Sequence, residues 1–411
     1  MTTLAGQASP ATLRSSPSAA DDRRVVFFVF VTVFLDMIGF GIVIPLLPFY
    51  VQAMGGSAQT VGLILGSFSL TQLIATPILG RLSDRYGRRP VILLSLAGNS
   101  LAMLVFALAT DLTLLPLLFA SRIFAGATAG NLSACQAAVA DVTEGAERAR
   151  GMGRVGAGVG LGMVLGPVVA SLLIPLGAWA PPLGAALLAF GDLVGVFFLM
   201  PETHRRRGAS PAPSKPAGAA ASDLWSVIRE RRVLVVLVLY FLAFLCLTNI
   251  QTALALLAHE RLGWGAVTVG RVFGLFGLVS LVVQGGLIGR MARGLGRANV
   301  LVLGAACAMG GLATIAAAGG AATLLAGVVA FAFGVGSTLP LLASLASDYA
   351  GSERQGALLG IAQSAGGLAR TVGPVWAGLL FARFGAAAPF WGGTLTAAIW
   401  LAFCLGLRRG R

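Results

Sequence analysis

The chain is dominated by a succession of apolar runs, each long enough to cross a membrane and separated from the next by a short polar segment. About 20 apolar residues in a helix span the hydrocarbon core of a bilayer. We predict twelve membrane-spanning helices, at residues 25–50, 60–80, 90–109, 112–136, 150–174, 180–200, 233–257, 266–289, 299–318, 321–345, 355–381 and 386–407. The sequence therefore predicts an all-α membrane protein.

Composition supports this prediction and excludes other classes. Hydrophobic residues make up 57% of the 411 residues and charged residues 11%, against about 45–50% and about 25% in soluble globular domains. A soluble enzyme, a disordered chain and a secreted disulfide scaffold are all excluded. The four cysteines lie inside apolar runs without a paired spacing, which is typical of small packing residues.

The net charge of +14 comes almost wholly from arginine, since Lys215 is the only lysine. The basic residues cluster in segments on one side of the predicted membrane. The five exceptions are Arg122, Arg261, Arg271, Arg370 and Arg383. Such clusters mark cytoplasmic loops, so we predict that both termini are cytoplasmic and that no nucleic acid is bound. Residues 1–24 are predicted to be a disordered tail, and residues 408–411 a second cytoplasmic tail.

The chain contains an internal repeat. Residues 80–91 and 289–300 are similar at an offset of 209, Gly166-Pro167 matches Gly373-Pro374 at 207, and Asp141 matches Asp348 at 207. We therefore predict two six-helix bundles, residues 25–200 and 233–407, joined by a cytoplasmic loop at 201–232. Many secondary transporters use such repeats to place a substrate site at the midplane of the membrane.

Four stretches and one short motif carry a family resemblance: residues 36–48, 80–91, 122–126 and 162–167, with Pro-Glu-Thr at 201–203. On these the chain resembles the major facilitator superfamily, and within it the drug:proton antiporter branch of twelve-span, tetracycline-efflux-like exporters. The resemblance implies two bundles that rock around a central cavity. Spans 1, 4, 7 and 10 are expected to line that cavity.

The loop after the second span is expected to form a cytoplasmic latch that is made in one transport state and broken in the other. The residues assigned to it are Gly80, Asp84, Arg85, Gly87, Arg88, Arg89 and Asp141. Gly80 and Gly87 would permit tight turns. The alternative is that the arginines only anchor the topology. The second copy has Arg293 where the first has Asp84, so its latch should be weakened or absent.

The fifth span carries small residues every four positions, namely Gly158, Gly162, Gly166 and Ala170. Such a stripe lets helix backbones approach closely in lipid, and Pro167 removes a backbone donor. One interpretation is tight packing alone. The other, implied by the similarity to an antiporter motif, is a movable contact that limits leak through the centre.

Four charged residues are predicted near mid-membrane: Asp36, Arg122, Asp192 and Arg370. Each such charge costs about 2.5–3.5 kcal/mol on insertion scales and is functional by default. Two acids and two bases suggest compensating pairs, and Asp36 beside Arg122 is the expected one. Asp36 is the predicted proton carrier. Asp192 is either a structural partner or a second proton site.

Enzyme signatures fail in their sequence context. The GxGxxG match at 151–156 opens a membrane helix, and no phosphate-binding GxxxxGK[ST] sequence occurs. His204 and His259 are too far apart to suggest a metal site. We therefore expect no enzymatic activity and no cofactor, with the proton gradient as the energy source.

We predict a monomer in the cytoplasmic (inner) membrane that exports small amphipathic or cationic organic compounds in exchange for protons. The alternatives are a proton-coupled importer or a metabolite or lipid exporter of the same fold, and a non-transporting receptor or scaffold. Ala102 and Ala308 stand where the tetracycline exporters carry acids, so the resemblance does not extend to tetracycline as the substrate.

Overall fold

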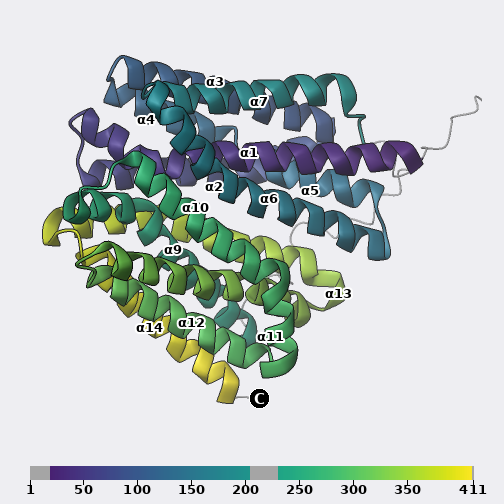
Figure 1. Ribbon diagram of the computed structural model, residues 1–411. Coiled ribbons are helices and arrows are strands. Elements are labelled where there is room, and N and C mark those ends of the chain that lie inside the picture. Colours follow the sequence, from purple (N-terminus) through teal and green to yellow (C-terminus); the bar gives the residue numbers. More distant parts are fainter. Residues whose placement is uncertain (1–18, 204–229, 410–411) are drawn as a thin grey trace, which may run out of the picture.

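A computed structural model describes residues 19–203 and 230–409, and within these ranges the chain is helical and has no strand. Most of the predicted N-terminal tail (1–18), most of the predicted inter-bundle loop (204–229) and the last two residues (410–411) lie outside the described residues. The N-terminal half (Figure 1) consists of α1 (Ala19–Ala53), α2 (Ala58–Tyr86), α3 (Arg88–Asp111), α4 (Leu115–Ala127), α5 (Asn131–Val142), α6 (Gly145–Leu173), a 3-10 turn η1 (Ile174–Leu176) and α7 (Ala180–Leu199). Because α1 begins at Ala19, the last six residues of the predicted tail are helical.

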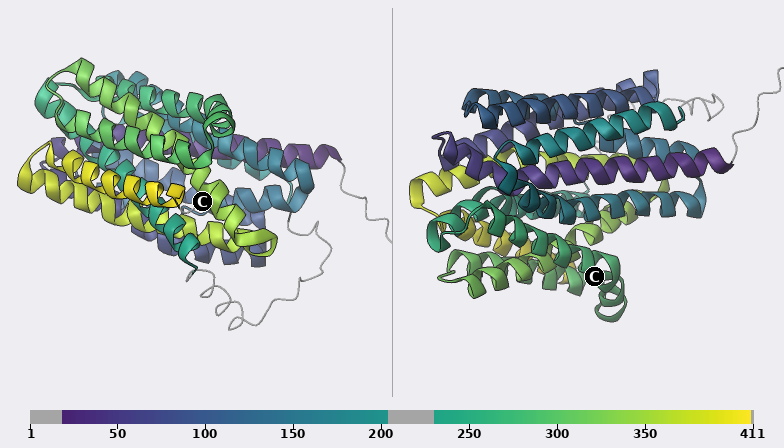
Figure 2. Two further views of the ribbon diagram at one scale, coloured as in Figure 1. Left: turned by 90° about the horizontal axis from the view of Figure 1, so that it is seen from below. Right: turned by 45° about the horizontal axis from the view of Figure 1, so that its top comes forward.

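The C-terminal half repeats this order with small differences. It consists of α9 (Arg231–Leu262), α10 (Ala266–Val282), a π-helical turn η2 (Val283–Leu287), α11 (Ile288–Leu295), α12 (Arg297–Ala316), α13 (Ala321–Phe384) and α14 (Ala388–Arg409). In Figure 2 the two halves lie side by side, with their helices along roughly one direction. α10, η2 and α11 together form the eighth predicted span.

Within the described residues, ten helices are long and apolar enough to cross a membrane. Two differences separate this number from the twelve predicted spans. The fourth span is broken at residues 128–130 into α4 and α5, each of which is short. The tenth and eleventh spans are both contained in α13.

The first part of α13 runs antiparallel to α12. Gly327 lies beside Gly311, whereas Gly334, farther along α13, lies beside Gly304, which is earlier in α12. A straight helix of 64 residues would be about 96 Å long at 1.5 Å per residue. That is about three times the thickness of the hydrocarbon core, so α13 cannot cross the membrane once as a straight rod.

The last part of α13 runs parallel to α9, because Gly366 lies beside Phe244 and Gly373 beside Thr248. α9 and α12 end on the same side, where Arg261 near the end of α9 donates to the backbone carbonyls of Ala316, the last residue of α12, and Ala318. The two parts of α13 therefore run in opposite directions. α13 crosses the membrane twice, which together with α4–α5 gives the predicted six spans in each half.

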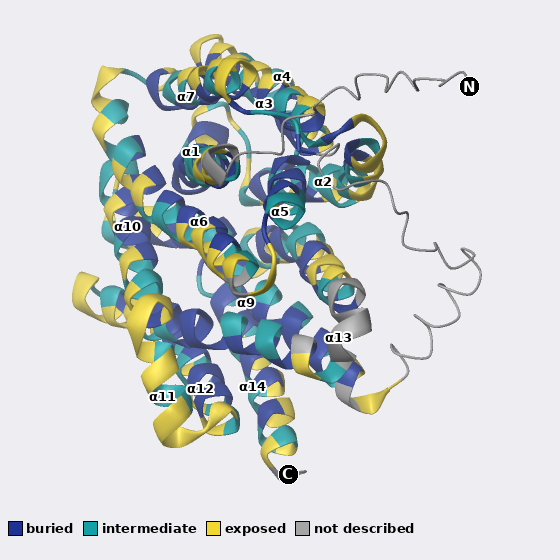
Figure 3. Ribbon diagram, turned by 90° about the vertical axis from the view of Figure 1, so that its right-hand side faces the viewer, coloured by how far each residue is buried: buried dark blue, intermediate teal, exposed yellow. Residues whose placement is uncertain are grey.

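Each half has its own apolar interior. Two buried clusters lie in the N-terminal half and one in the C-terminal half, and Figure 3 shows buried residues turned inward in each half. Large apolar side chains such as Phe198 and Leu172 are 75% and 70% exposed. On a soluble protein such surfaces would be interaction sites, whereas here the surrounding phase is lipid.

The halves meet along two symmetric seams. In the first, Gly62 and Gly66 of α2 lie against the backbone of α13, and a Cβ at Gly66 would lie 2.9 Å from the carbonyl oxygen of Thr371. In the second, a Cβ at Gly277 of α10 would lie 2.9 Å from the Cα of Val164 in α6. Glycine on one partner thus lets backbones from opposite halves touch.

The last part of α1 is also held against the other half. The ring of Phe49, near the end of α1, packs edge-on against His259, near the end of α9, with 5.7 Å between ring centroids. Ile44 belongs to the buried cluster of the C-terminal half. The cluster around the first part of α1, which includes Val25 and Val29, contains residues of the N-terminal half only. The contacts that join the halves therefore favour the end of α1 away from the chain terminus.

Candidate functional site

A single residue, Gly87, separates α2 from α3. Its φ of 109° lies in the region that favours glycine, and a Cβ there would lie 2.5 Å from a carboxylate oxygen of Glu202. Backbone conformation and lack of space both require glycine here, as predicted for a tight turn. Gly80, in contrast, lies inside α2, where a Cβ would meet no atom within 4 Å, so its predicted role in a turn is wrong.

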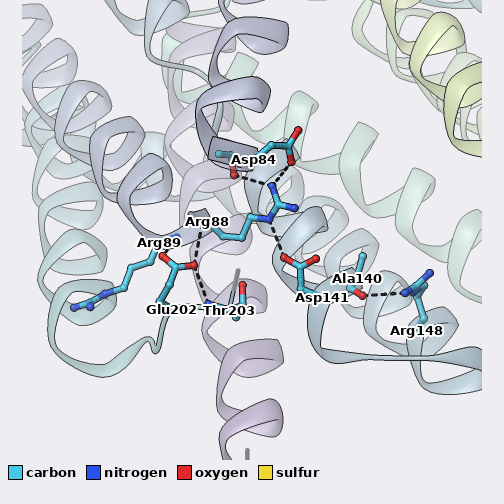
Figure 4. A network of polar contacts seen from close by, with 9 residues as sticks. Asp84, Arg88, Arg89, Ala140, Asp141, Arg148, Glu202 and Thr203 are labelled. Atoms are coloured by element: carbon cyan, nitrogen blue, oxygen red, sulfur yellow. Dashed lines mark hydrogen bonds and ion pairs between the residues drawn. The ribbon is translucent and has the colours of Figure 1, made fainter. Parts of the chain in front are cut away.

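The structure brings Asp84, Arg88 and Asp141 together, as the latch prediction required (Figure 4). The guanidinium of Arg88 contacts Asp84 Oδ1 at 2.5 Å through Nη1 and Asp141 Oδ2 at 2.8 Å through Nε. The side chains of Arg88 and Asp141 are 12% and 10% exposed, and that of Asp84 is 71% exposed. One arginine thus joins a sheltered acid on α5 to an exposed acid on α2.

Glu202, just after α7, completes the network and was not among the predicted latch residues. Its carboxylate accepts hydrogen bonds from the backbone N–H groups of Arg88, at 3.0 Å, and Arg89, at 3.2 Å (Figure 4). A carboxylate at a helix N-terminus satisfies unpaired donors and the helix dipole. The Pro-Glu-Thr motif directly after the sixth span was the sequence signal for it.

The remaining latch arginines have different surroundings. Arg89 donates to the backbone carbonyl of Phe197 and lies over its ring, 5.7 Å from the centroid. Arg89 therefore fastens the start of α3 to the end of α7. Arg85 lies over the ring of its neighbour Tyr86. Four helix ends, those of α2, α3, α5 and α7, are held together at this corner.

The second copy retains part of the same network. Arg297, at the start of α12, contacts Asp348 of α13 at 2.5 Å. These residues correspond to Arg88 and Asp141 in the first copy. Both side chains are about half exposed, at 45% and 52%, and Arg293 replaces the second acid. The predicted weakening is therefore seen as one exposed ion pair in place of two.

The small-residue stripe of α6 packs directly against α1. A Cβ at Gly162 would lie 2.6 Å from the carbonyl oxygen of Phe34, and a Cβ at Gly166 would lie 2.6 Å from the Cα of Gly41. Gly158 extends the same contact toward the start of α1. These distances confirm the predicted close approach of backbones.

The opposite side of α6 faces the other half. The carbonyl oxygen of Pro167 lies beside Gly270 of α10, and α6 continues through Pro167 as one helix. α6 is therefore placed between α1 and the C-terminal half, on one of the two seams. A shift of α1 against α6 would be transmitted directly to that seam.

The two acids within the membrane both lie between helices of the N-terminal half and have neutral partners. Asp36 Oδ1 accepts a hydrogen bond from Asn99 Nδ2 of α3 at 3.1 Å. Asp192 Oδ1 accepts one from Thr32 Oγ1 of α1 at 3.0 Å. Asp192 is 5% exposed, and its Oδ2 is buried without a hydrogen-bond partner.

The two arginines within the membrane lie against aromatic rings. Arg122, 3% exposed, lies 4.6 Å from the centroid of Phe106 and directs Nη2 toward the sulfur of Met103 at 3.5 Å. Arg370 lies 4.8 Å from the centroid of Phe244. Aromatic faces attract cations by about 0.5–2 kcal/mol. Both arginines therefore lie against side chains of the protein.

The expected compensating pairs are not formed. Among the described residues, no ion pair joins Asp36 or Asp192 to Arg122 or Arg370. Arg122 extends from α4 toward the later turns of α3, whereas Asp36 meets α3 at Asn99. Neutral hydrogen-bond donors surround the acids and aromatic rings surround the bases. The predicted Asp36–Arg122 pair is therefore wrong for this conformation.

Other chemistry has little support in the described residues. No group of three or more His, Cys, Asp or Glu side chains in residues 19–203 and 230–409 is placed to hold a metal ion. His259 lies at the end of α9, against Phe49. His204 lies outside the described residues.

The chain is similar to known membrane transport proteins along nearly its whole length. The family model for the Major Facilitator Superfamily matches residues 29–374. Tetracycline resistance protein, class C, of Escherichia coli is 32% identical over 387 residues, covering 92% of this chain and 95% of that protein. Major facilitator superfamily domain-containing protein 10 of Bos taurus is 30% identical and covers 93% and 92%.

Solved structures give the same result for the fold. The human organic anion transporter TETRAN is 26% identical, with a TM-score of 0.71 over 93% of this chain and 99% of that one. A bacterial homologue of the lysosomal transporter Spinster, inward-facing and occupied, has a TM-score of 0.76 at 14% identity, over 96% and 98% of the two chains. The latter shows likeness of fold alone. With the duplicated bundles, the corner network and the glycine stripe, these relatives establish that the chain belongs to the major facilitator superfamily, within its drug:proton antiporter branch.

Proposed function

We propose that this protein is a proton-coupled secondary active transporter that exports small amphipathic or cationic organic compounds by alternating access. The observation that carries the proposal is the presence of two acids inside the membrane part of the N-terminal half, each with a neutral partner. Buried acids that lack a basic partner can bind and release protons. The relatives named tetracycline resistance proteins support drug efflux as the direction of transport.

The two seams supply the hinge for alternating access. Apart from Ile44, the halves have separate apolar interiors, and they meet where glycine backbones touch, along α2–α13 and α6–α10. Small side chains at a contact allow two rigid bundles to tilt against each other while the backbones remain close. The substrate is proposed to bind between the bundles, as in transporters built from such repeats.

The corner network is proposed to act as the cytoplasmic latch. It fixes the ends of four helices of one half, so this corner would move as a unit. Arg88 and Asp141 are sheltered, whereas Asp84 is 71% exposed. Asp84 is therefore the member that remains available to the opposite half in another state of the cycle.

The proton gradient is the proposed energy source, and Asp36 the proposed carrier at the centre of α1. A membrane potential contributes about 2.3 kcal/mol per charge per 100 mV, so one proton suffices for modest accumulation of substrate. The protein is proposed to act as a monomer in the cytoplasmic (inner) membrane with both termini cytoplasmic. No cofactor is needed for this mechanism.

A second candidate substrate class is organic anions. It is favoured by Arg370, which lies over Phe244 without a carboxylate partner among the described residues. The human organic anion transporter at 26% identity points to the same class. Import in place of export, or export of a metabolite or lipid, would use the same architecture.

Transport into inside-out membrane vesicles tests the proposal. Three probes distinguish the substrate classes: ethidium for amphipathic cations, tetracycline for the named relatives, and fluorescein for organic anions. Vesicles with the protein should accumulate at least one probe when acidified inside, and a protonophore should abolish the accumulation. Vesicles without the protein are the control. Accumulation that persists without any ion gradient would refute proton coupling.

A further inference from the structure

The two acids of the N-terminal half share one face of α1. Thr32 and Asp36 are four residues apart, so their side chains lie one above the other on the helix. Thr32 donates to Asp192 of α7, and Asp36 accepts from Asn99 of α3. Both carboxyl groups therefore lie against the same strip of α1, enclosed by α3 and α7.

Asp192 has too few hydrogen-bond donors around it for an ionised carboxylate. One oxygen accepts a single hydrogen bond from Thr32, and the other, Oδ2, is buried without a partner. An ionised carboxylate has about four acceptor sites to satisfy, and leaving them bare in a buried site is expensive. A proton on Oδ2 removes the charge and makes that oxygen a hydrogen-bond donor, while Thr32 satisfies the other oxygen.

The charged and titratable groups around Asp192 provide no cation. α1 contributes Asp36, which is a second acid, and α5 contributes Cys135, which interacts electrostatically with both acids. α3 contributes the neutral side chains of Asn99 and Ser95. No arginine of the described residues forms an ion pair with Asp192. Nothing in these surroundings except a proton neutralises the carboxylate.

Two of the other buried polar atoms without a partner in this half lie on α3 and α5. They are Oγ of Ser95 on α3 and Nδ2 of Asn131 on α5. The hydrogen bond from Ser100 to the carbonyl of Ala186 fixes how the antiparallel α3 and α7 lie against each other. Counting back five residues on α3 and forward six on α7 places Ser95 at the level of Asp192. The hydroxyl group of Ser95 is thus unpaired at the level of the Asp192 carboxyl group.

We propose that Asp192 is a proton-binding group of the transport cycle, and that it forms with Asp36 a two-carboxyl site enclosed by α1, α3 and α7. The inference rests on the proposed proton-coupled transport. Binding forms an O–H bond on Oδ2 and neutralises the carboxylate, and release restores the charge. Asp192 is protonated in the conformation described here.

This position separates the proton from the substrate. The residues of the two-carboxyl site belong to α1, α3 and α7, whereas the seams are formed by α2–α13 and α6–α10. α1 links the two-carboxyl site to the α6–α10 seam, because the contact of Gly41 with Gly166 places α1 against α6. Proton and substrate therefore act on each other through movement of α1 against α6, without competing for one carboxyl group.

Infrared difference spectroscopy on the purified full chain tests for the proton directly. A step from mildly acidic to alkaline pH should remove the carbonyl band of a buried, protonated carboxyl group. That band should be missing in Asp192→Asn and shifted in Thr32→Val, which removes its hydrogen-bond donor. Ser100→Ala, which breaks a different α3–α7 hydrogen bond, is the control and should keep the band. A band unchanged in Asp192→Asn would overturn the proposal.

A transport measurement then tests whether the proton is used. With whichever of ethidium, tetracycline and fluorescein the wild type moves, Asp192→Asn should lose at least tenfold in proton-driven accumulation. It should still bind the probe, and its affinity for the probe should depend less on pH than that of the wild type. Wild-type accumulation by Asp192→Asn would reduce the proton to a structural one and refute the proposal, while leaving proton-coupled export through Asp36 intact. Protonophore-insensitive transport by the wild type would instead refute the proposed function itself.

Discussion

Removing the sheltered acid of the corner network should destabilise the protein far more than removing the exposed one. Arg88 lies between Asp141, 10% exposed, and Asp84, 71% exposed. An exposed ion pair contributes about 0.2–1 kcal/mol. Breaking a fully buried pair costs about 3–5 kcal/mol because a charge is left unpaired. Since Arg88 would keep Asp84 and some solvent, we expect about 1–3 kcal/mol for Asp141→Asn.

The second copy provides a matched control for this comparison. Asp348→Asn removes the equivalent acid from an ion pair whose members are about half exposed. Thermal unfolding of the three purified variants, followed by loss of the monodisperse peak in size-exclusion chromatography, should rank Asp141→Asn well below Asp84→Asn and Asp348→Asn. If Asp141→Asn were no less stable than Asp348→Asn, burial would not determine the strength of this network.

Removing the exposed acid, Asp84, should impair transport although it has little effect on stability. Asp84→Asn should fold and accumulate in the membrane nearly as the wild type does, because the loop arginines that set topology remain. Its transport should nevertheless be severely reduced, since Asp84 is the latch residue that is available to the opposite half. Wild-type flux in Asp84→Asn would show that the loop is only a topological anchor.

Three further variants test other contacts. Gly166→Val should lower the stability of the fold by about 1–3 kcal/mol through overpacking against α1 and reduce the yield of folded protein. Gly156→Ala is the control, because a Cβ there meets no atom within 4 Å, and it should not reduce the yield. Equal yields would show that the close contact of α6 with α1 does not limit stability. Glu202→Gln should lower stability by about 0.3–1 kcal/mol by removing a charge from a helix N-terminus, and a loss that does not shrink in high salt would contradict this cause. The swap Asp36→Arg with Arg122→Asp should fail to restore transport, because the two residues are not paired; substantial rescue would show that they meet in another state.

The architecture was predictable because it depends on features that the sequence displays directly. Apolar runs of membrane-spanning length, arginine clusters and the offset repeat predict two bundles of six spans. The stripe of Gly158, Gly162 and Gly166 likewise predicts close backbone contact, since four-residue spacing fixes one face of a helix. The contact of this stripe with α1 confirms that reasoning.

The partners of the intramembrane charges were not predictable in the same way. A helix that is apolar all round has no polar face to fix its rotation, so the direction of Asp36 or Arg122 cannot be derived from periodicity. The break at residues 128–130 also interrupts the continuous helix that was predicted for the fourth span, which carries Arg122. Hydrogen bonds from Asn99 and contacts with Phe106 depend on three-dimensional packing of separate helices.

The corner network lies between these extremes. Sequence similarity predicts Asp84, Arg88 and Asp141 as a group, and the structure brings them together. Glu202 was noticed only as part of a motif that closes the sixth span. Its role requires knowing that α7 ends beside the start of α3, where Gly87 leaves room for its carboxylate.

The most direct test of proton-coupled export is proton movement driven by the substrate alone. Purified protein would be reconstituted in liposomes containing a pH-sensitive dye, with equal pH on both sides and a transported probe added outside. Proton-coupled antiport predicts that probe entering the liposomes drives protons out, so that the interior becomes alkaline, and that the pH change disappears with Asp36→Asn. Probe that crosses the membrane at the same rate with no change in internal pH would contradict the account.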